Sequence, residues 1–175
     1  KEDMFRFLED FVREVVPLFP GKYFHIGGDE CPKTSWKHCP TCQKRIQNEG
    51  LQADGKHSAE ERLQSYVIKR MEKMLAKYDR KIIGWDEILE GGLSPEATVM
   101  SWRGTSGGIS AALQKHDVIM TPGSGGLYLD HYQGDYKIEP VTIPSAPAYL
   151  SRTYNYEPVP DTINSLGLEK HILGV

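Results

Sequence analysis

Short apolar runs that alternate with helical patterns constrain the fold of this chain more than any other feature. The runs at 81–85 (KIIGW), 98–102 (TVMSW) and 117–121 (DVIMT) are apolar through their centres and do not alternate with polar residues. Similar runs lie at 23–26 and 171–175. Continuous apolar runs of this length are typical of parallel strands that are covered on both faces. The sequence therefore predicts an α/β fold with five parallel strands.

Two long helical patterns lie between these runs. Residues 1–19 carry apolar side chains at helical spacing until Pro17 interrupts the pattern. Ser58 and Glu61 match the S-x-x-E capping box, in which the two side chains satisfy free N–H groups at a helix start. The apolar face that follows predicts a helix from Ser58 to Arg80.

The other connections are shorter or less regular. A short helix is predicted over 108–115, and a turn or two of helix over 42–48. The rest of 31–55 is polar and interrupted by proline and glycine, and 122–160 is rich in glycine, tyrosine and proline. Both stretches are therefore predicted as loops.

Composition excludes several classes of function. The chain has 175 residues, which is enough for one domain with a sizeable core. Its net charge of -3 comes from mixed acidic and basic residues, so nucleic-acid binding has no electrostatic support. No apolar run approaches the roughly 20 residues that a membrane span needs. The chain has no visible signal peptide and does not start with Met, so we expect it to be part of a longer protein.

Acidic and aromatic side chains repeatedly follow the predicted strands. They are Asp29 and Glu30, Trp85 to Glu87, Trp102 and Arg103, and Tyr128 to Asp130. A (β/α)8 TIM barrel builds its site from residues at the C-terminal ends of its strands, and a doubly wound sheet also gathers them at one edge. No G-x-G-x-x-G opens a helix after a strand and no P-loop is present, which favours the barrel.

The adjacent carboxylates Asp29 and Glu30 indicate the chemistry of this edge. Like charges this close oppose each other's ionisation. Aromatic rings stack on the apolar face of a pyranose and carboxylates accept hydrogen bonds from its hydroxyls, so the combination suggests a sugar site. Plainer interpretations stay open, because Asp29 and Glu30 alone are also compatible with a helix N-cap and a Trp after a buried strand is often core. Residues 128–132 are also compatible with an edge strand.

Four motifs in order resemble one enzyme family. HIGGDE at 25–30 looks like the H-x-G-G-D-E signature of family 20 glycoside hydrolases, the β-N-acetylhexosaminidases. GWDEIL at 84–89, SWRG at 101–104 and YLDHYQ at 128–133 continue the resemblance. It implies that the chain is one partial catalytic domain that carries roughly the last five strands of a TIM barrel. The early strands and their sugar-binding arginine are absent, so we expect an exposed barrel edge and an isolated fragment that is unstable, associated with itself, or inactive.

The resemblance implies catalytic roles for the two adjacent acids. Glu30 is expected to protonate the glycosidic oxygen as general acid and then to activate water as base. Asp29 is expected to orient the substrate's own 2-acetamido group, whose carbonyl oxygen attacks the anomeric carbon. Both side chains must then reach one sugar although neighbouring strand residues point to opposite faces, so the backbone must turn after the strand. Gly27 and Gly28 permit that turn.

The resemblance also implies substrate-binding roles. Trp85 and Trp102 are expected to wall the pocket, and Tyr128 to donate a hydrogen bond to the acetamido carbonyl oxygen. Asp130 is expected to hold a sugar hydroxyl, and His25 to support the acid through a buried polar network. Two weaker candidates are Asp86, in a supporting role, and Glu87, as an acid at a helix N-terminus. The isolated histidines are expected to be surface or internally satisfied residues: His57, His116 and His131.

The implied activity is removal of terminal β-linked N-acetylhexosamine from glycans or glycoconjugates through an oxazolinium intermediate. No cofactor is implied. The substrate class implies a periplasmic or secreted protein, and the choice between GlcNAc and GalNAc stays open. A second hypothesis is a carbohydrate-binding barrel remnant without catalysis.

Three cysteines in one loop support a third hypothesis. Cys31, His38, Cys39 and Cys42 lie in CPKTSWKHCPTC, which offers the ligand types of a Cys3His zinc module. The direct adjacency of His38 and Cys39 fits one tetrahedral ion poorly, and no second C-x-x-C follows. A disulfide between two of the three in an oxidising compartment is favoured over zinc, and free thiols in a reducing one stay open.

Overall fold

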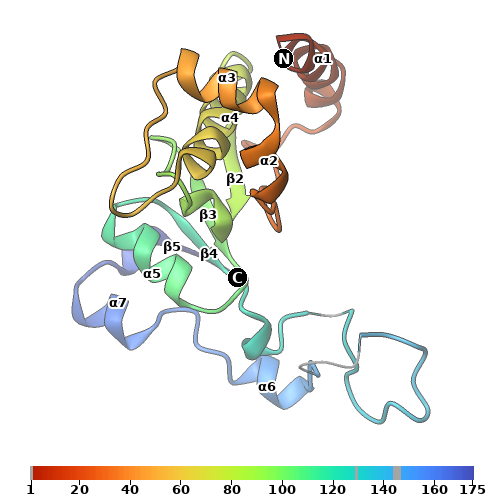
Figure 1. Ribbon diagram of the computed structural model, residues 1–175. Helices are drawn as coiled ribbons and strands as arrows, with labels where there is room; N and C mark the ends of the chain where they lie inside the picture. The colour runs from red at the N-terminus through yellow and green to blue at the C-terminus, as the bar shows by residue number, and fades with distance from the viewer. Residues whose placement is uncertain (1, 129, 144–146) are drawn as a thin grey trace. The chain divides into compact units, whose positions relative to one another are not determined.

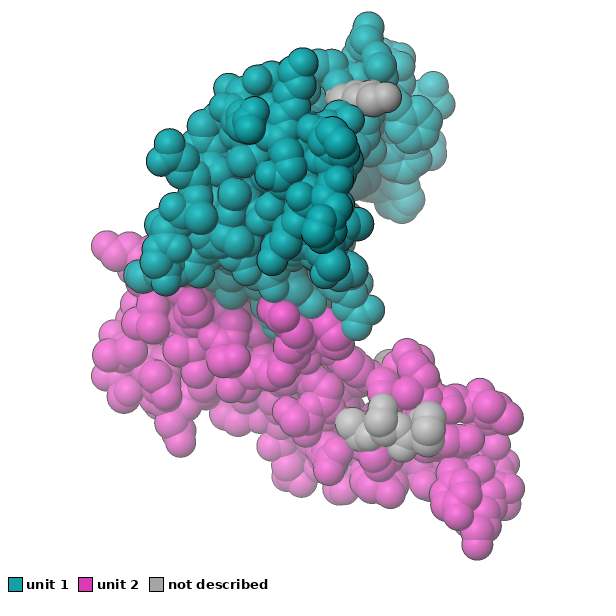
Figure 2. Space-filling view, in the orientation of Figure 1, with its two compact units in different colours: residues 1–98 teal, residues 99–175 magenta. Residues whose placement is uncertain are grey.

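The computed structural model describes residues 2–128, 130–143 and 147–175 (Figure 1). The chain divides into two compact units, residues 1–98 and residues 99–175 (Figure 2). In both units strands alternate with helices, and each strand pairing that the structure defines within a unit is parallel. No helix of the described residues is long and apolar enough to cross a membrane.

The first unit contains two strands and most of the helical residues. Its elements are α1 (Glu2–Val15), the 3-10 helix η1 (Val16–Leu18), β1 (Tyr23–His25), α2 (Thr34–His38), α3 (Pro40–Asn48), α4 (Ala59–Ala76), β2 (Lys81–Trp85) and η2 (Asp86–Leu89). Strands β1 and β2 pair in parallel, with Phe24 opposite Ile82. Helix α4 contacts α1, α3 and β2, so it is the centre of the packing in this unit.

The capping box predicted for α4 is confirmed. The Ser58 hydroxyl accepts a hydrogen bond from the Glu61 backbone N–H at 3.2 Å, and the Glu61 carboxylate accepts one from the Ser58 N–H at 2.6 Å. Both bonds satisfy donors that the first helical turn leaves free. The apolar face of α4 is buried along its length at Leu63, Ile68, Met74 and Leu75.

The second unit repeats the alternation with shorter elements. They are β3 (Thr98–Ser101, which begins at the last residue of the first unit), α5 (Ser106–Leu113), β4 (Val118–Met120), η3 (Gly123–Gly125), α6 (Leu150–Tyr154), α7 (Asp161–Ser165), η4 (Glu169–His171) and β5 (Ile172–Gly174). Strand β4 pairs in parallel with β3 and with β5. Helix α5 contacts β4 and α7, and the Ile163 side chain of α7 is fully buried.

All five predicted strands form, each within one or two residues of its expected ends. The short helices α2, α6 and α7 lie where no helix was predicted, because five residues are too few to show a helical period. The alternative of an edge strand over 128–132 is reduced to one isolated bridge between His131 and Ile143, and Leu129 lies outside the described residues.

Candidate active site

The turn that carries the two adjacent acids begins where β1 ends. The hydrogen-bond ladder to β2 runs past the strand, because the Ile26 N–H donates to the Ile83 carbonyl at 2.8 Å and the Trp85 N–H to the Gly27 carbonyl at 2.9 Å. The backbone then leaves the extended conformation, with φ of 73° at Gly27 and 101° at Gly28. These values lie in a region that suits glycine, so the prediction that Gly27 and Gly28 permit a turn here is confirmed.

Close packing also restricts the turn to glycine. A Cβ atom on Gly28 would lie 2.7 Å from the Cγ2 atom of Ile88 in η2, which is closer than carbon atoms approach. The Gln64 side-chain amide, on the buried face of α4, donates to the Gly28 carbonyl at 3.1 Å and to the Glu87 carbonyl at 3.4 Å. Gln64 therefore joins the acid-bearing turn to the segment that follows β2. The sequence analysis missed it, and the available signal was an amide side chain beside the apolar positions of α4.

Both acids of the turn are accessible. Asp29 and Glu30 are exposed side chains, as a group that meets a ligand must be. Glu30 has a φ of 44°, which is uncommon for a residue with a side chain. Local backbone strain of this kind is held in place by surrounding structure and clusters at functional sites. Asp29 also borders a hollow of about 500 Å3, but neither Glu30 nor Trp85 lines it and its other walls are mostly apolar.

His25 and Trp85 pack together at the ends of β1 and β2. Their ring centroids are 4.8 Å apart at an interplanar angle of 61°. The His25 Nδ1 atom accepts a hydrogen bond from the Gly27 N–H at 3.1 Å, so the imidazole braces the turn. His25 is exposed and not buried as expected, because β1 is the first strand in the sheet order of the described residues. Its neighbours still desolvate it enough to lower the pKa of the imidazole, against the opposing charge of Asp29.

Two further acids follow β2 and are buried. Asp86 and Glu87 open η2 and are 2% and 4% exposed. Glu87 was expected to be an acid at a helix N-terminus, and it lies in the first turn of η2, where it is buried. The supporting role of Asp86 stays a prediction, and its burial beside the acid-bearing turn suits such a role.

Three other predicted residues meet in the second unit. Trp102, Tyr128 and Asp130 all line one open hollow of about 490 Å3. The Tyr128 hydroxyl donates a hydrogen bond to the Trp102 backbone carbonyl at 3.2 Å. Trp102 and Tyr128 are partly exposed, and Asp130 is exposed, so all three offer surface to a ligand.

His131 joins this group, although its sequence position gave it no assigned role. It is 7% exposed, its Nδ1 atom lies 3.0 Å from an Asp130 carboxylate oxygen, and its ring centroid is 5.3 Å from that of Tyr128. It is internally satisfied, which was one of the expected outcomes. Its position directly after Asp130 in the YLDHYQ motif was the signal that it orients that carboxylate.

The structure thus brings the predicted residues together in two sets. The first unit holds His25, Asp29, Glu30 and Trp85 at the ends of β1 and β2, and the second holds Trp102, Tyr128 and Asp130 around one hollow. The convergence of both sets on a single sugar stays a prediction. Among the described residues, no group of three or more His, Cys, Asp or Glu side chains is arranged to hold a metal ion, which leaves the zinc hypothesis without support.

A comparison of the chain with models of known protein families identifies its family. The family model described as glycosyl hydrolase family 20, catalytic domain, matches residues 1–175. The chain belongs to glycosyl hydrolase family 20. The resemblance seen in the four motifs is therefore confirmed, and the enzyme family is that of a glycosidase.

Relatives within family 20 cover nearly the whole chain. A β-hexosaminidase of Porphyromonas gingivalis is 59% identical over 171 residues, which are 98% of this chain and 21% of that protein. A β-hexosaminidase of Vibrio furnissii is 34% identical over 98% of this chain and 27% of its own length. The chain thus spans about a fifth to a quarter of these relatives.

Solved family 20 structures share the fold. A crystal structure of the exo β-N-acetylglucosaminidase of Vibrio harveyi, in an inactive variant, matches 97% of this chain and 26% of its own with a TM-score of 0.80 at 30% identity. The same Vibrio harveyi enzyme in complex with N-acetylglucosamine matches 96% of this chain with a TM-score of 0.79. The α/β fold is therefore that of part of a family 20 TIM barrel, as the sequence predicted.

Proposed function

We propose that the protein containing this chain removes terminal β-linked N-acetylhexosamine by substrate-assisted, retaining hydrolysis. One observation carries the proposal. The H-x-G-G-D-E motif of a family 20 chain forms a sharp turn at the end of β1 and exposes both acids there. The C-terminal ends of strands are where TIM barrels hold their catalytic groups. Relatives named β-hexosaminidase and a relative solved with N-acetylglucosamine support the substrate class.

The proposed reaction has two steps. In the first, Glu30 donates its proton to the glycosidic oxygen while the acetamido carbonyl oxygen of the substrate bonds to the anomeric carbon. The leaving alcohol departs with that proton, and an oxazolinium ring forms on the sugar. In the second step, the Glu30 carboxylate takes a proton from water, whose oxygen attacks the anomeric carbon and reopens the ring. Two inversions at this carbon give net retention of configuration.

The two acids have different tasks, although they are neighbours. Asp29 stays charged, orients the acetamido group and stabilises the positive charge that develops on the oxazolinium ring. Glu30 must hold a proton at the start and release it at the end. The turn suits this division because the backbone no longer alternates as in a strand, and positive φ values at Gly27, Gly28 and Glu30 change the direction of successive residues.

The binding residues complete the proposal. Trp85 and Trp102 are proposed to stack against the sugar and its acetamido methyl group. Tyr128 is proposed to aim the acetamido carbonyl, and Asp130 to accept a hydrogen bond from a sugar hydroxyl, with His131 holding its carboxylate. His25 is proposed to brace the turn below the acids through its bond to Gly27.

Replacing the acid tests the catalytic assignment. In the full-length protein, we expect Glu30→Gln to lower kcat on an N-acetylglucosaminide by about 10²- to 10⁴-fold, the usual contribution of general acid–base catalysis. Binding of the product sugar should remain. Glu14→Gln on the exposed side of α1 is the matched control and should leave kcat unchanged. Unchanged turnover in Glu30→Gln contradicts the assignment of Glu30 as the acid. Sugar binding without any turnover in the unaltered full-length protein supports a binding protein without catalysis.

Substrate assistance has its own test. A thiazoline that mimics the cyclised intermediate should inhibit competitively and far more tightly than the product sugar, because it resembles the species that the site stabilises. A substrate with a hydroxyl in place of the 2-acetamido group should not be hydrolysed. Hydrolysis of that analogue at a similar rate means that an enzyme group attacks the sugar.

The substrate class favours a periplasmic or secreted location, because an enzyme there encounters glycans with terminal amino sugars. Fractionation of the native host, with the protein followed by antibody, tests this part of the proposal. Recovery only with the cytoplasmic fraction contradicts it.

A further inference from the structure

Cys39 and Cys42 form a close thiol pair at the junction between α2 and α3. The Cys39 backbone N–H donates to the Trp36 carbonyl at 3.3 Å, which ends α2, and the same residue caps the N-terminus of α3. The Cys39 sulfur accepts a hydrogen bond from the Cys42 N–H at 3.4 Å, and the two thiols interact closely enough to shift each other's pKa. The two residues are therefore neighbours across the first turn of α3.

The two thiols differ in their tendency to ionise. The backbone N–H of Cys42, its thiol and the N–H of Thr41 stabilise the Cys39 thiolate at the start of α3 and lower the pKa of Cys39. Burial and the neighbouring Cys39 sulfur raise the pKa of Cys42. When the pair loses its first proton, the negative charge therefore forms on Cys39.

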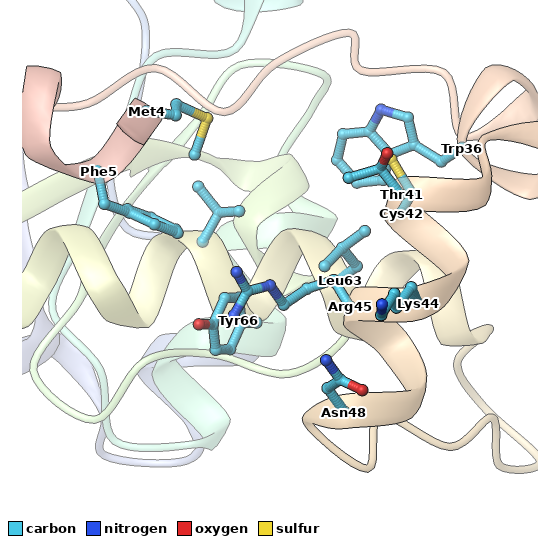
Figure 3. Close-up of a pocket in the computed structure, with 11 residues that line it drawn as sticks. Met4, Phe5, Trp36, Thr41, Cys42, Lys44, Arg45, Asn48, Leu63 and Tyr66 are labelled. Atoms are coloured by element: carbon cyan, nitrogen blue, oxygen red, sulfur yellow. The ribbon is translucent and has the colours of Figure 1, made fainter. Parts of the chain in front are cut away.

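The surroundings make the pair accessible from one side. Both residues are partly exposed, and Cys42 lines a hollow of about 430 Å3 between α1, α3 and α4. Figure 3 shows Cys42 beside Thr41 and Trp36 on one side of this hollow, with the α1 side chains across from them.

We propose that Cys39 and Cys42 are a thiol–disulfide exchange site that a low-molecular-weight disulfide oxidises. The Cys39 thiolate attacks one sulfur of that disulfide, a mixed disulfide forms, and the other half leaves as a thiolate that takes up a proton. Cys42 then loses its proton and attacks the Cys39 sulfur, which closes an internal disulfide and releases the second thiol. Two electrons pass from the protein dithiol to the small disulfide. This site is independent of the proposed hydrolysis.

The structure distinguishes this pair from other uses of the cysteines. No third His, Cys, Asp or Glu joins the two sulfurs in a metal-binding cluster among the described residues, which include all three cysteines. Cys31 lies eight residues before Cys39, directly after Glu30, and has no hydrogen bond to either sulfur among the side-chain hydrogen bonds of the described residues. It is therefore the internal control.

Peptide mapping in the full-length protein tests the pairing. Trypsin releases residues 38–44 with both paired cysteines and residues 23–33 with Cys31, so the two kinds of thiol are read separately. The reduced protein is equilibrated with glutathione and glutathione disulfide at varied ratios, quenched in acid and alkylated. We expect 38–44 to lose two hydrogen atoms and both alkylation sites in one two-electron transition, while 23–33 shows no link to it.

Variants test the two roles. Cys42→Ser lacks the resolving thiol and should accumulate glutathione on residue 39, whereas Cys39→Ser should leave residue 42 mostly unmodified. Cys31→Ser should leave the transition of 38–44 unchanged. In the reduced protein, Cys39 should react with iodoacetamide faster than Cys42 at neutral pH, because its thiolate is favoured. Far-UV circular dichroism of each variant reports whether the protein remains folded.

Three results overturn the proposal. They are retention of both alkyl groups on 38–44 in the most oxidising buffer, a disulfide that joins 23–33 to 38–44, and equal or faster modification of residue 42 in Cys39→Ser than of residue 39 in Cys42→Ser. The first excludes an exchange site, the second assigns Cys31 to the pair, and the third reverses the order of attack.

Discussion

The turn after β1 and the segment around Tyr128 hold their predicted site residues in different ways. The first is fixed by the backbone: the ladder to β2 reaches Gly27, and Gln64 of α4 holds the next carbonyl. The second lies in a long connection with little regular structure, where a side chain bonds to the Trp102 carbonyl and two others bond to each other. The comparison suggests that the proposed catalytic acids depend on a rigid scaffold, and that the sugar-contacting residues depend on local side-chain bonds.

The largest expected effect comes from adding a methyl group to the rigid turn. Gly28→Ala places a Cβ atom 2.7 Å from Ile88 at a φ of 101°, so both sterics and backbone conformation oppose it. We expect a loss of about 2–4 kcal/mol in the free energy of unfolding, measured by urea denaturation.

The matched change in the second region should cost less. Gly123→Ala meets a Tyr128 ring carbon at 3.1 Å, and a side chain in a loop is able to shift by a few tenths of an ångström. Gly21→Ala, with no atom within 4 Å, is the neutral control and should change stability by less than about 0.5 kcal/mol. If Gly28→Ala and Gly123→Ala lower the free energy of unfolding equally, the turn after β1 is no more rigid than the segment around Tyr128.

Loss of the Gln64 amide should have the next largest effect. Gln64→Ala leaves the Gly28 and Glu87 carbonyls without this donor and should lower stability by about 1–3 kcal/mol. Turnover of the full-length protein should fall as well, because the acid-bearing turn loses its tie to α4. Gln47→Ala on the exposed face of α3 is the control. A stable Gln64→Ala protein with full activity shows that the β ladder alone holds the turn.

Removing one hydroxyl should have a smaller effect on stability. Tyr128→Phe loses the bond to the Trp102 carbonyl and should cost about 1 kcal/mol. If Tyr128 aims the acetamido group, kcat/KM on an N-acetylglucosaminide falls further than this stability change explains. Tyr136→Phe, at a residue that is 64% exposed, is the control and should alter neither quantity. Unaltered kinetics in Tyr128→Phe assign the hydroxyl to the loop alone.

The smallest expected effect is the pH response of His25. Partial burial lowers the pKa of the imidazole in the folded protein below the ordinary 6.5, so the unfolded chain binds this proton more readily. Above pH 6.5, His25 is neutral in both the folded and the unfolded protein, and its contribution to stability is complete. As the pH falls from 6.5 towards the pKa of the folded protein, the unfolded chain is protonated first and stability falls. An NMR titration of the ring should show the low midpoint.

Asp29→Asn tests whether the Asp29 charge contributes to the pKa of His25. Removing the nearby negative charge should lower the His25 midpoint further, because that charge opposes the effect of burial. A midpoint that rises or stays constant in Asp29→Asn shows that the two side chains do not interact.

Sequence reasoning recovered the fold because the strands and the long helix are coded locally. The capping box of Ser58 and Glu61 and the apolar runs need no tertiary information. Gln64 was missed because its importance depends on which carbonyls lie above α4, and those come from other segments. The short helix α2 was missed because it is set by its position between the acid-bearing turn and the Cys39 junction, not by a repeating pattern.

The site was predicted through its motifs more than through physical rules. Residue types at the strand ends indicated a sugar site, and the order of four motifs gave the family, which the family match confirms. The sequence did not indicate that His25 is exposed, that Glu87 is buried, or that His131 lies against Tyr128. Each of these follows from packing between segments that are distant in the chain.

The positive φ of Glu30 has a consequence for engineering. Glycine adopts this conformation at little cost, whereas a residue with a Cβ atom pays about 1–2 kcal/mol for it. A library screened only for heat resistance will therefore enrich Glu30→Gly and discard the proposed proton donor. Thermal selection on this chain needs a simultaneous assay for turnover.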